Sequence, residues 1–243
     1  MAGLERGERA ERAVPAESME TAAVVGRFAP SPTGQLHLGN LRTALVAWLS
    51  ARAAAGRFVV RMEDLDRVTS RRELEVVQLD ELAAIGLDWD GDVVRQSERF
   101  ERYEAAIAML VAADWTYECF CTRREIREAA SAPHHPPDAD GRYPGTCRRL
   151  SAAARAAKRA DGRRPALRLL ADGHQIAFED AVVGRSSAAV DDIVLRRNDG
   201  VPAYNLAVVV DDAAQGVTEV VRGDDLLSST PSQIHLGGLL GLP

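Results

Sequence analysis

Four short apolar runs, each followed at once by polar residues, constrain this sequence more than any other feature. The stretch between the first two runs, residues 36–55, has the apolar periodicity of a helix. A strand, a helix and a second strand in that order predict a parallel α/β sheet, which binds ligands at the carboxyl ends of its strands. The four predicted strands are Val24–Ala29, Phe58–Val60, Ala207–Val210 and Val217–Val221.

The rest of the chain predicts a second region between two halves of that sheet. Periodicity indicates helices over residues 72–85, 98–113 and 232–240, and alternation over 166–190 indicates short antiparallel strands. Residues 131–144 are rich in Pro, His, Asp and Gly and predict a loop. We therefore expect a flexible tail (1–22), a first half-domain (23–85), an inserted subdomain (86–190) and a second half-domain (191–243).

Composition narrows the class of protein. No apolar run approaches the roughly 18 residues of a membrane helix, and the first 22 residues lack the apolar stretch of a signal peptide. We expect a cytoplasmic protein with no membrane partner. The net charge is −6, yet nine of the residues from Arg142 to Arg168 are basic and one is acidic. This segment is either a phosphate-binding patch or a solvated basic helix.

The segment Arg27–Asn40 (RFAPSPTGQLHLGN) has the pattern of a phosphate-binding loop. It leads into the predicted helix at 36–55, whose first amides are free and whose dipole favours anions. Gly34 and Gly39 lack side chains, so a nucleotide can approach the backbone closely there. His37 is suited to contact phosphate oxygens and to offset charge that develops in a transition state.

This segment resembles the signature loop of class I aminoacyl-tRNA synthetases, with His37–Asn40 as the His-x-Gly-x core. The string Arg27–Gly34 is similar to the glutamyl branch. The resemblance implies a Rossmann-like parallel sheet with an inserted α+β, zinc-containing, acceptor-type subdomain. It implies catalytic roles for His37, Gly39 and Asn40, although many class I enzymes have a second histidine where Asn40 stands. The implied ATP-binding residues are Pro32, Thr33, Gly34, His37, Gly39 and Asn40.

A glutamate pocket needs cations for two carboxylates and an anion for one ammonium group. Arg27, Glu63 and Arg222 meet this need, and each lies near the end of a predicted strand. Asp64 and Asp66 are interpreted as structural, either capping a helix or holding arginines. The glutamyl resemblance implies a pocket formed by Arg27, Phe28, Ala29, Pro30, Ser31, Glu63, Tyr204 and Arg222.

Three cysteines, Cys119, Cys121 and Cys147, are the only ones in the chain, and they lie within 29 residues. An odd, clustered set favours a structural zinc site over disulfides. By chemistry alone, His134 or His135 would be the fourth ligand. The segment from Tyr143 to Arg148 (YPGTCR) resembles glutamyl-queuosine tRNA(Asp) synthetases, which implies Tyr143 instead.

The resemblance implies a ligase that uses ATP, with Mg²⁺, to convert L-glutamate into glutamyl-adenylate. It then transfers glutamate to queuosine in the anticodon of tRNA(Asp). A truncated glutamyl-tRNA synthetase that charges a 3′ end, and a non-catalytic zinc-containing RNA-binding module, stay open. The lysine-rich second signature of class I enzymes is not found, since Lys158 is the only lysine, so we expect a fragment of a longer protein. We also expect a monomer.

Overall fold

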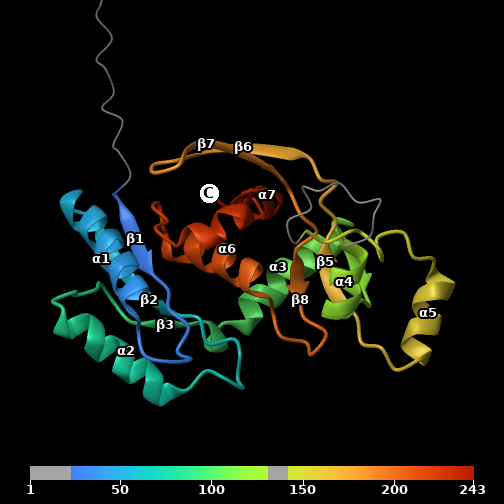
Figure 1. Cartoon of the computed structure of the whole chain (residues 1–243), viewed down its shortest axis with the longest axis horizontal. Coiled ribbons are helices and arrows are strands. Elements are labelled where there is room, and N and C mark those ends of the chain that lie inside the picture. The colour runs from blue at the N-terminus through green and yellow to red at the C-terminus, as the bar shows by residue number, and fades with distance from the viewer. Residues whose placement is uncertain (1–22, 131–141) are drawn as a thin grey trace, which may run out of the picture.

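The computed structural model describes residues 23–130 and 142–243, and a parallel sheet forms its N-terminal part (Figure 1). The strands follow the order β1-β2-β3, and Val25 lies opposite Arg57 in the first pair. The predicted α/β fold class is confirmed. The three strands are β1 (Val25–Phe28), β2 (Arg57–Met62) and β3 (Val94–Arg95).

Helix α1 (Leu38–Ala53) approaches β1 closely because small residues meet at the contact. Ala47 and Ala51 are buried, and a β-carbon on Gly26 would lie 3.2 Å from the Ala47 carbonyl oxygen. Helix α2 (Arg72–Ala84) adds Leu82 to the same core. This packing fixes the start of α1 beside the carboxyl end of β1.

A second region is built on an antiparallel sheet of order β4-β5-β8. The hairpin of β6 and β7 crosses above α7 (Figure 1), and both strands contact that helix. The predicted antiparallel strands are thus confirmed. The elements of this region are η1 (Gln96–Glu98), α3 (Phe100–Ala112), β4 (Thr116–Cys119), α4 (Arg123–Ala130), α5 (Ala152–Ala160), β5 (Ala166–Leu169), β6 (Gln175–Asp180), β7 (Gly184–Ala189) and β8 (Val194–Arg196).

The C-terminal part consists of α6 (Tyr204–Gln215), η2 (Asp224–Ser229) and α7 (Thr230–Leu239). The predicted strand at Ala207–Val210 is wrong, because these residues lie inside α6. The helix ends at Gly216, whose φ of 67° is the left-handed conformation typical of a helix C-terminus. Asp211 and Asp212 therefore lie within a helix, whereas the prediction placed them after a strand.

The predicted strand at Val217–Val221 is reduced to one parallel bridge between Gly26 and Glu219. The amides of Thr218 and Glu219 both donate to the Val25 carbonyl, so this extended segment still lies beside β1. Its end consequently brings Arg222 to the same edge of the sheet as the segment that follows β1.

The predicted tail over residues 1–22 lies outside the described residues, as does most of the predicted loop. Within the described ranges, no helix is both long enough and apolar enough to cross a membrane.

Candidate active site

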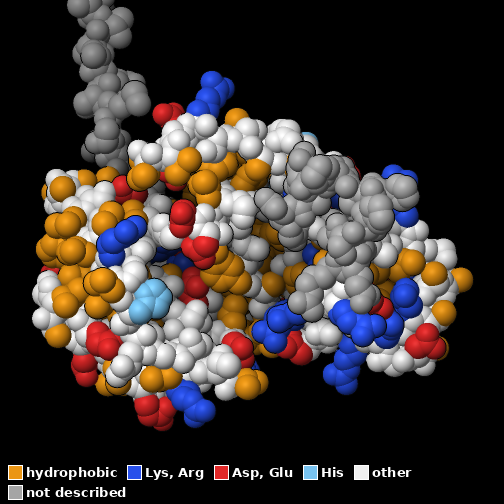
Figure 2. Space-filling model, in the orientation of Figure 1, with side chains coloured by type: hydrophobic (Ala, Val, Ile, Leu, Met, Phe, Trp, Pro, Cys, Tyr) orange, Lys and Arg blue, Asp and Glu red, His pale blue; other side chains and the backbone are white. Residues whose placement is uncertain are grey.

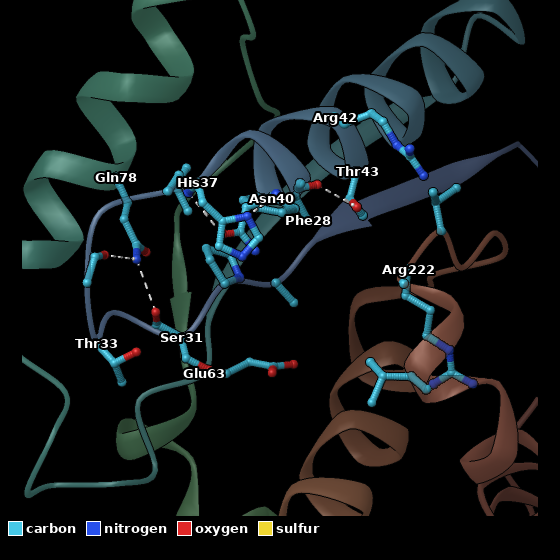
Figure 3. A pocket seen from close by; sticks show the side chains of 18 of the residues that line it. Phe28, Ser31, Thr33, His37, Asn40, Arg42, Thr43, Glu63, Gln78 and Arg222 are labelled. Atoms are coloured by element: carbon cyan, nitrogen blue, oxygen red, sulfur yellow. Dashed lines mark hydrogen bonds between the residues drawn. The ribbon is translucent and has the colours of Figure 1, made fainter.

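A cavity of about 680 Å³ lies at the carboxyl ends of β1 and β2, beside the start of α1 (Figure 3). Pro32, one of the residues predicted to bind ATP, lines a smaller neighbouring cavity instead. The structure brings the other predicted glutamate and ATP residues together around this one cavity: Arg27, Phe28, Ala29, Pro30, Ser31, Thr33, Gly34, His37, Gly39, Asn40, Glu63, Tyr204 and Arg222.

His37 is the N-cap of α1, and the backbone fixes its ring. The Asn40 amide donates to His37 Nδ1 at 3.3 Å, and the His37 amide donates to Asn40 Oδ1 at 3.2 Å, which makes a capping box. Because Nδ1 accepts, a neutral His37 carries its proton on Nε2, where it can donate to a phosphate oxygen. The Asn40 side chain is engaged in the cap, so its contact in the cavity is with His37.

The His37 ring lies so close to residue 39 that a side chain there would collide with it, which explains the glycine at this position. A β-carbon there would lie 2.9 Å from Cε1 and 3.0 Å from Nδ1 of His37. At Gly34 a β-carbon would meet no atom within 4 Å, so that backbone is open on the cavity side.

Gln78 is a site residue that the sequence reasoning missed. Its Nε2 donates to the carbonyl oxygens of Ser31 (3.0 Å) and Gly34 (2.7 Å), which ties the loop to α2 (Figure 3). Glu81, one turn later, accepts from the Leu36 amide at 2.9 Å. The available signal was the position of Gln78 on the buried face of α2, between Glu75 and Leu82.

The charged groups beneath the cavity form one network. Arg61 is fully buried, and its NH1 donates to Asp212 Oδ1 at 2.7 Å. Arg27 donates from NH1 to the Val221 carbonyl at 2.8 Å, and its Nε lies 3.5 Å from Asp212 Oδ1. Glu63 Oε1 lies 3.7 Å from Arg61 NH2. Burial raises the pKa of Glu63 to about 7, against the opposing charges of Arg61 and Arg27.

Asp64 and Asp66, interpreted as structural, make local contacts. Asp64 accepts from the amide of Ser97 at 2.8 Å and from its hydroxyl at 2.5 Å. Asp66 accepts from the Val68 amide at 2.9 Å. Asp64 thus holds the 3₁₀ turn after β3.

Tyr204 and Arg222 complete the cavity on the side of α6 and α7. Burial raises the pKa of Tyr204 to about 12, and the negative charge of Glu63 adds to this effect. Arg222 lines the cavity on the side across from α1 (Figure 3). The cavity therefore presents arginines, the carboxylates of Glu63 and Asp225 and a helix start, which together suit a zwitterion with an extra carboxylate beside a phosphate group.

The three cysteines and Tyr143 form a separate cluster at the end of β4. Cys121 Sγ lies 3.5 Å from Cys147 Sγ, and the Tyr143 hydroxyl lies 3.2 Å from Cys119 Sγ and 3.4 Å from Cys121 Sγ. A tetrahedral zinc ion with bonds of about 2.3 Å holds its sulfur atoms about 3.8 Å apart, so the four groups fit one ion. His134 and His135 lie outside the described residues.

A wider groove of about 1,160 Å³ joins the two sites. It shares Ser31, Glu63 and Tyr204 with the first cavity and extends to Cys119 and Arg163. Lys and Arg side chains gather at the lower right of the molecule in Figure 2, on the side where α4 and α5 lie.

Some of the predicted basic patch is engaged in structural contacts. Arg148 pairs with the buried Asp192 at 2.6 Å, Arg163 pairs with Glu125 at 2.9 Å, and Arg168 is buried. Some arginines between residues 142 and 168 therefore stabilise the fold and are not free to bind phosphate groups.

Comparison with known proteins decides the family. The family described as tRNA synthetases class I (E and Q), catalytic domain, matches residues 23–243. The chain belongs to this class I synthetase family. That membership implies ATP and Mg²⁺.

Curated relatives include two proteins named glutamyl-Q tRNA(Asp) synthetase. One from Nocardia farcinica is 64% identical over 90% of this chain and 68% of its own length. One from Symbiobacterium thermophilum is 50% identical over 90% of this chain and 71% of its own length. A glutamate–tRNA ligase from Nitratidesulfovibrio vulgaris is 49% identical over 90% of this chain and 46% of its own length.

Solved structures agree on the fold of this synthetase chain. A glutamate tRNA ligase from Elizabethkingia meningosepticum, determined in complex with its amino acid, has a TM-score of 0.75 and 30% identity, over 90% of this chain and 47% of that one. The enzyme from Elizabethkingia anophelis has a TM-score of 0.76 and 29% identity, over 90% and 48%. The chain thus spans about half the length of these solved relatives.

Proposed function

We propose that this protein is a ligase that activates L-glutamate with ATP and transfers it to queuosine in the anticodon of tRNA(Asp). The observation that carries the proposal is the single cavity in which Arg27, Glu63 and Arg222 meet the start of α1 at His37. The name of the Nocardia farcinica relative, at 64% identity, supports queuosine tRNA(Asp) as the acceptor. A cytoplasmic location and a monomeric state stay predictions.

In the first step a carboxylate oxygen of glutamate attacks the α-phosphorus of ATP, and pyrophosphate leaves. The ammonium group pairs with Glu63, and arginines hold the carboxylates. His37 Nε2–H donates to a phosphate oxygen as its negative charge increases, and the amides at the start of α1 act in the same direction. No covalent intermediate with the protein is needed, because positioning and charge stabilisation account for catalysis.

In the second step a hydroxyl oxygen of the queuosine cyclopentenediol attacks the carbonyl carbon of glutamyl-adenylate, and AMP leaves. The groove beside Ser31, Glu63 and Tyr204 supports this step because it reaches the adenylate position from the cysteine cluster. The Arg164 side chain in its lining is suited to RNA phosphates.

The cysteine cluster is proposed to hold one structural zinc ion through Cys119, Cys121, Tyr143 and Cys147. In the protein without metal, burial raises the pKa of the Cys121 thiol to about 12, so a bound cation is what would make its thiolate stable. A set of four protein ligands is closed, and the ion would therefore stabilise the fold and take no part in the reaction.

Glutamate-dependent exchange of labelled pyrophosphate into ATP, measured without and with tRNA, tests activation. Labelled glutamate transfer is then compared on tRNA(Asp) with queuosine and on the same tRNA with guanosine in its place. Exchange without tRNA, together with transfer to the queuosine form alone, is expected. Exchange that requires tRNA, with label at the 3′ end, would instead identify a glutamyl-tRNA synthetase activity, which the 49% identity to a glutamate–tRNA ligase favours. If the protein shows no exchange and no transfer, the proposal is wrong.

A further inference from the structure

Arg222 is held in a different way from Arg27, which also lines the cavity, and from Arg61, which is buried beneath it. Arg61 lies 2.7 Å and Arg27 lies 3.5 Å from Asp212 Oδ1, so both have a carboxylate partner. Within the described residues, the Arg222 guanidinium has no ion pair and donates instead to two neutral oxygens. Its positive charge is therefore supported by hydrogen bonds, and the carboxylates of Asp212 and Asp180 act on it without forming an ion pair.

The neutral support comes from one face of α7. NH1 of Arg222 donates to Gln233 Oε1 at 2.6 Å, and NH2 donates to Thr230 Oγ1 at 2.5 Å. Thr230 and Gln233 are three residues apart in the helix, so their side chains lie on the same face. Both residues are partly buried. Their two hydrogen bonds hold the guanidinium against α7.

The amide of Gln233 is itself oriented by α6. Its Nε2 donates to Asn205 Oδ1 at 2.9 Å, which leaves Oε1 as the atom that faces Arg222. Asn205 directly follows Tyr204, whose side chain lines the cavity. The hydrogen bonds from Arg222 to Gln233 and from Gln233 to Asn205 thus fix the orientation of all three side chains between the starts of α6 and α7.

We propose that Gln233, supported by Asn205 and assisted by Thr230, is a positioning residue that makes this cavity selective for an amino acid with a carboxylate side chain. It fixes the Arg222 guanidinium and leaves its charge available to the substrate. This inference rests on the proposed function, since it names what sets the affinity for glutamate at that site.

The physical reason is the difference between an amide and a carboxylate as the acceptor. Two of the five N–H groups of Arg222 are used by its neutral support, and the others can bind a substrate carboxylate. A carboxylate at position 233 would accept the same hydrogen bond but would also neutralise the guanidinium before glutamate arrives. A bound glutamate would then gain less than it does from an unpaired cation.

The deciding variant is Gln233→Glu, which keeps the shape of the side chain and adds the competing charge. It also replaces the donor to Asn205 by an oxygen, so the Asn205 amide must turn and donate in its place. Calorimetric binding of glutamate is expected to weaken by about tenfold or more, since charge-assisted hydrogen bonds are roughly twice as strong as neutral ones. The KM for glutamate in pyrophosphate exchange should rise in parallel, whereas the KM for ATP and kcat should change by less than about threefold. Discrimination between glutamate and glutamine should fall.

Two further variants separate this effect from simpler causes. Ile234 is 47% exposed and is adjacent on α7, so Ile234→Glu adds the same charge to the same helix without the contact. Its glutamate affinity should equal that of wild type. Thr230→Val removes the second neutral acceptor without adding charge, and it should weaken glutamate binding by about threefold through loss of one hydrogen bond. This variant tests the support if Gln233→Glu fails to fold by circular dichroism.

Glutamate affinity of wild-type strength in folded Gln233→Glu, or in Thr230→Val, would overturn the inference. An equal loss in Ile234→Glu would also overturn it, because the effect would then be general to charge on α7. Direct binding distinguishes these results from failure of the proposed function. If wild-type protein neither binds nor activates glutamate, the proposed function itself is wrong and the inference falls with it.

Discussion

Replacing Glu63 by glutamine is expected to stabilise the fold at pH 8 while it removes the anion for the substrate ammonium group. The Glu63 side chain is 9% exposed, and burial raises its pKa from 4.5 to about 7. Because the folded state holds this proton more tightly than the unfolded chain, the contribution of Glu63 favours folding below pH 4.5 and is lost as the pH rises through 7. At about 1.4 kcal/mol per pKa unit, ionisation costs the folded protein about 3 kcal/mol.

Urea unfolding followed by circular dichroism at pH 5.5 and 8.0 measures this cost. The linkage relation assigns about 2 kcal/mol of the ionisation cost to the interval between pH 5.5 and pH 8.0. The free energy of unfolding of Glu63→Gln, relative to that of wild type, should therefore be higher at pH 8.0 than at pH 5.5 by this amount. Asp80→Asn, which replaces an exposed carboxylate on α2, is the control and should show a difference that is independent of pH. A constant difference between wild type and Glu63→Gln would refute the argument from burial.

The same residue predicts a pH dependence of substrate binding. Between pH 8 and pH 6 the ionised fraction of a carboxyl group with a pKa of about 7 falls about tenfold. The Kd for glutamate in wild-type protein should therefore rise about tenfold over this range. Calorimetry should find weaker binding without this pH dependence in Glu63→Gln, and a wild-type Kd that is unchanged at pH 6 would contradict the assigned role.

Three other perturbations test the loop and the cysteine cluster. Gly39→Ala places a β-carbon 2.9 Å from the His37 ring, so kcat in pyrophosphate exchange should fall about tenfold or more while glutamate binding persists; an unchanged kcat would argue against His37 at the phosphates. Gln78→Met removes two hydrogen bonds to the loop and should raise the KM for ATP about tenfold, with equal KM values contradicting this support. Cys147→Ser should lose one equivalent of zinc by atomic absorption and lower Tm by about 5 °C or more, whereas equal zinc content would exclude Cys147 as a ligand.

The sequence predicted β1, β2 and the long helices because their apolar patterns are strong. It did not predict β3. It failed at Ala207–Val210, where a run of valines with high strand propensity lies in α6. The helical assignment follows from tertiary packing, since Leu206, Ala207 and Asp211 are buried on one side of that helix. Gly216 was the available signal, because a glycine after such a run is typical of a helix end.

The residues of the cavity were predicted more completely than their contacts. Arg27, Glu63 and Arg222 could be found from motif and position, because strand ends gather at one edge of a sheet. Gln78 and Gln233 could not, since each acts through a side-chain amide that reaches a different element. Such contacts depend on how helices dock against the sheet, and a single sequence pattern does not specify that docking.

Helix α6 links the charges of the cavity to the core of the molecule. Its first residues, Tyr204 and Asn205, contribute to the cavity and to the support of Gln233. Two turns later, Asp211 is fully buried and accepts from the Tyr103 hydroxyl at 2.7 Å and from Arg99 Nε at 2.7 Å. The adjacent carboxylate, Asp212, holds Arg27 and Arg61.

This arrangement divides the arginines into two kinds. Arg27 and Arg61 share the carboxylate of Asp212, so part of their charge is balanced before any substrate binds. Arg222 rests on Thr230 and Gln233, which are neutral, and it keeps its charge for a ligand. Because α6 and α7 fix both kinds of support, the proposed electrostatic preference for an acidic amino acid depends on the docking of these two helices.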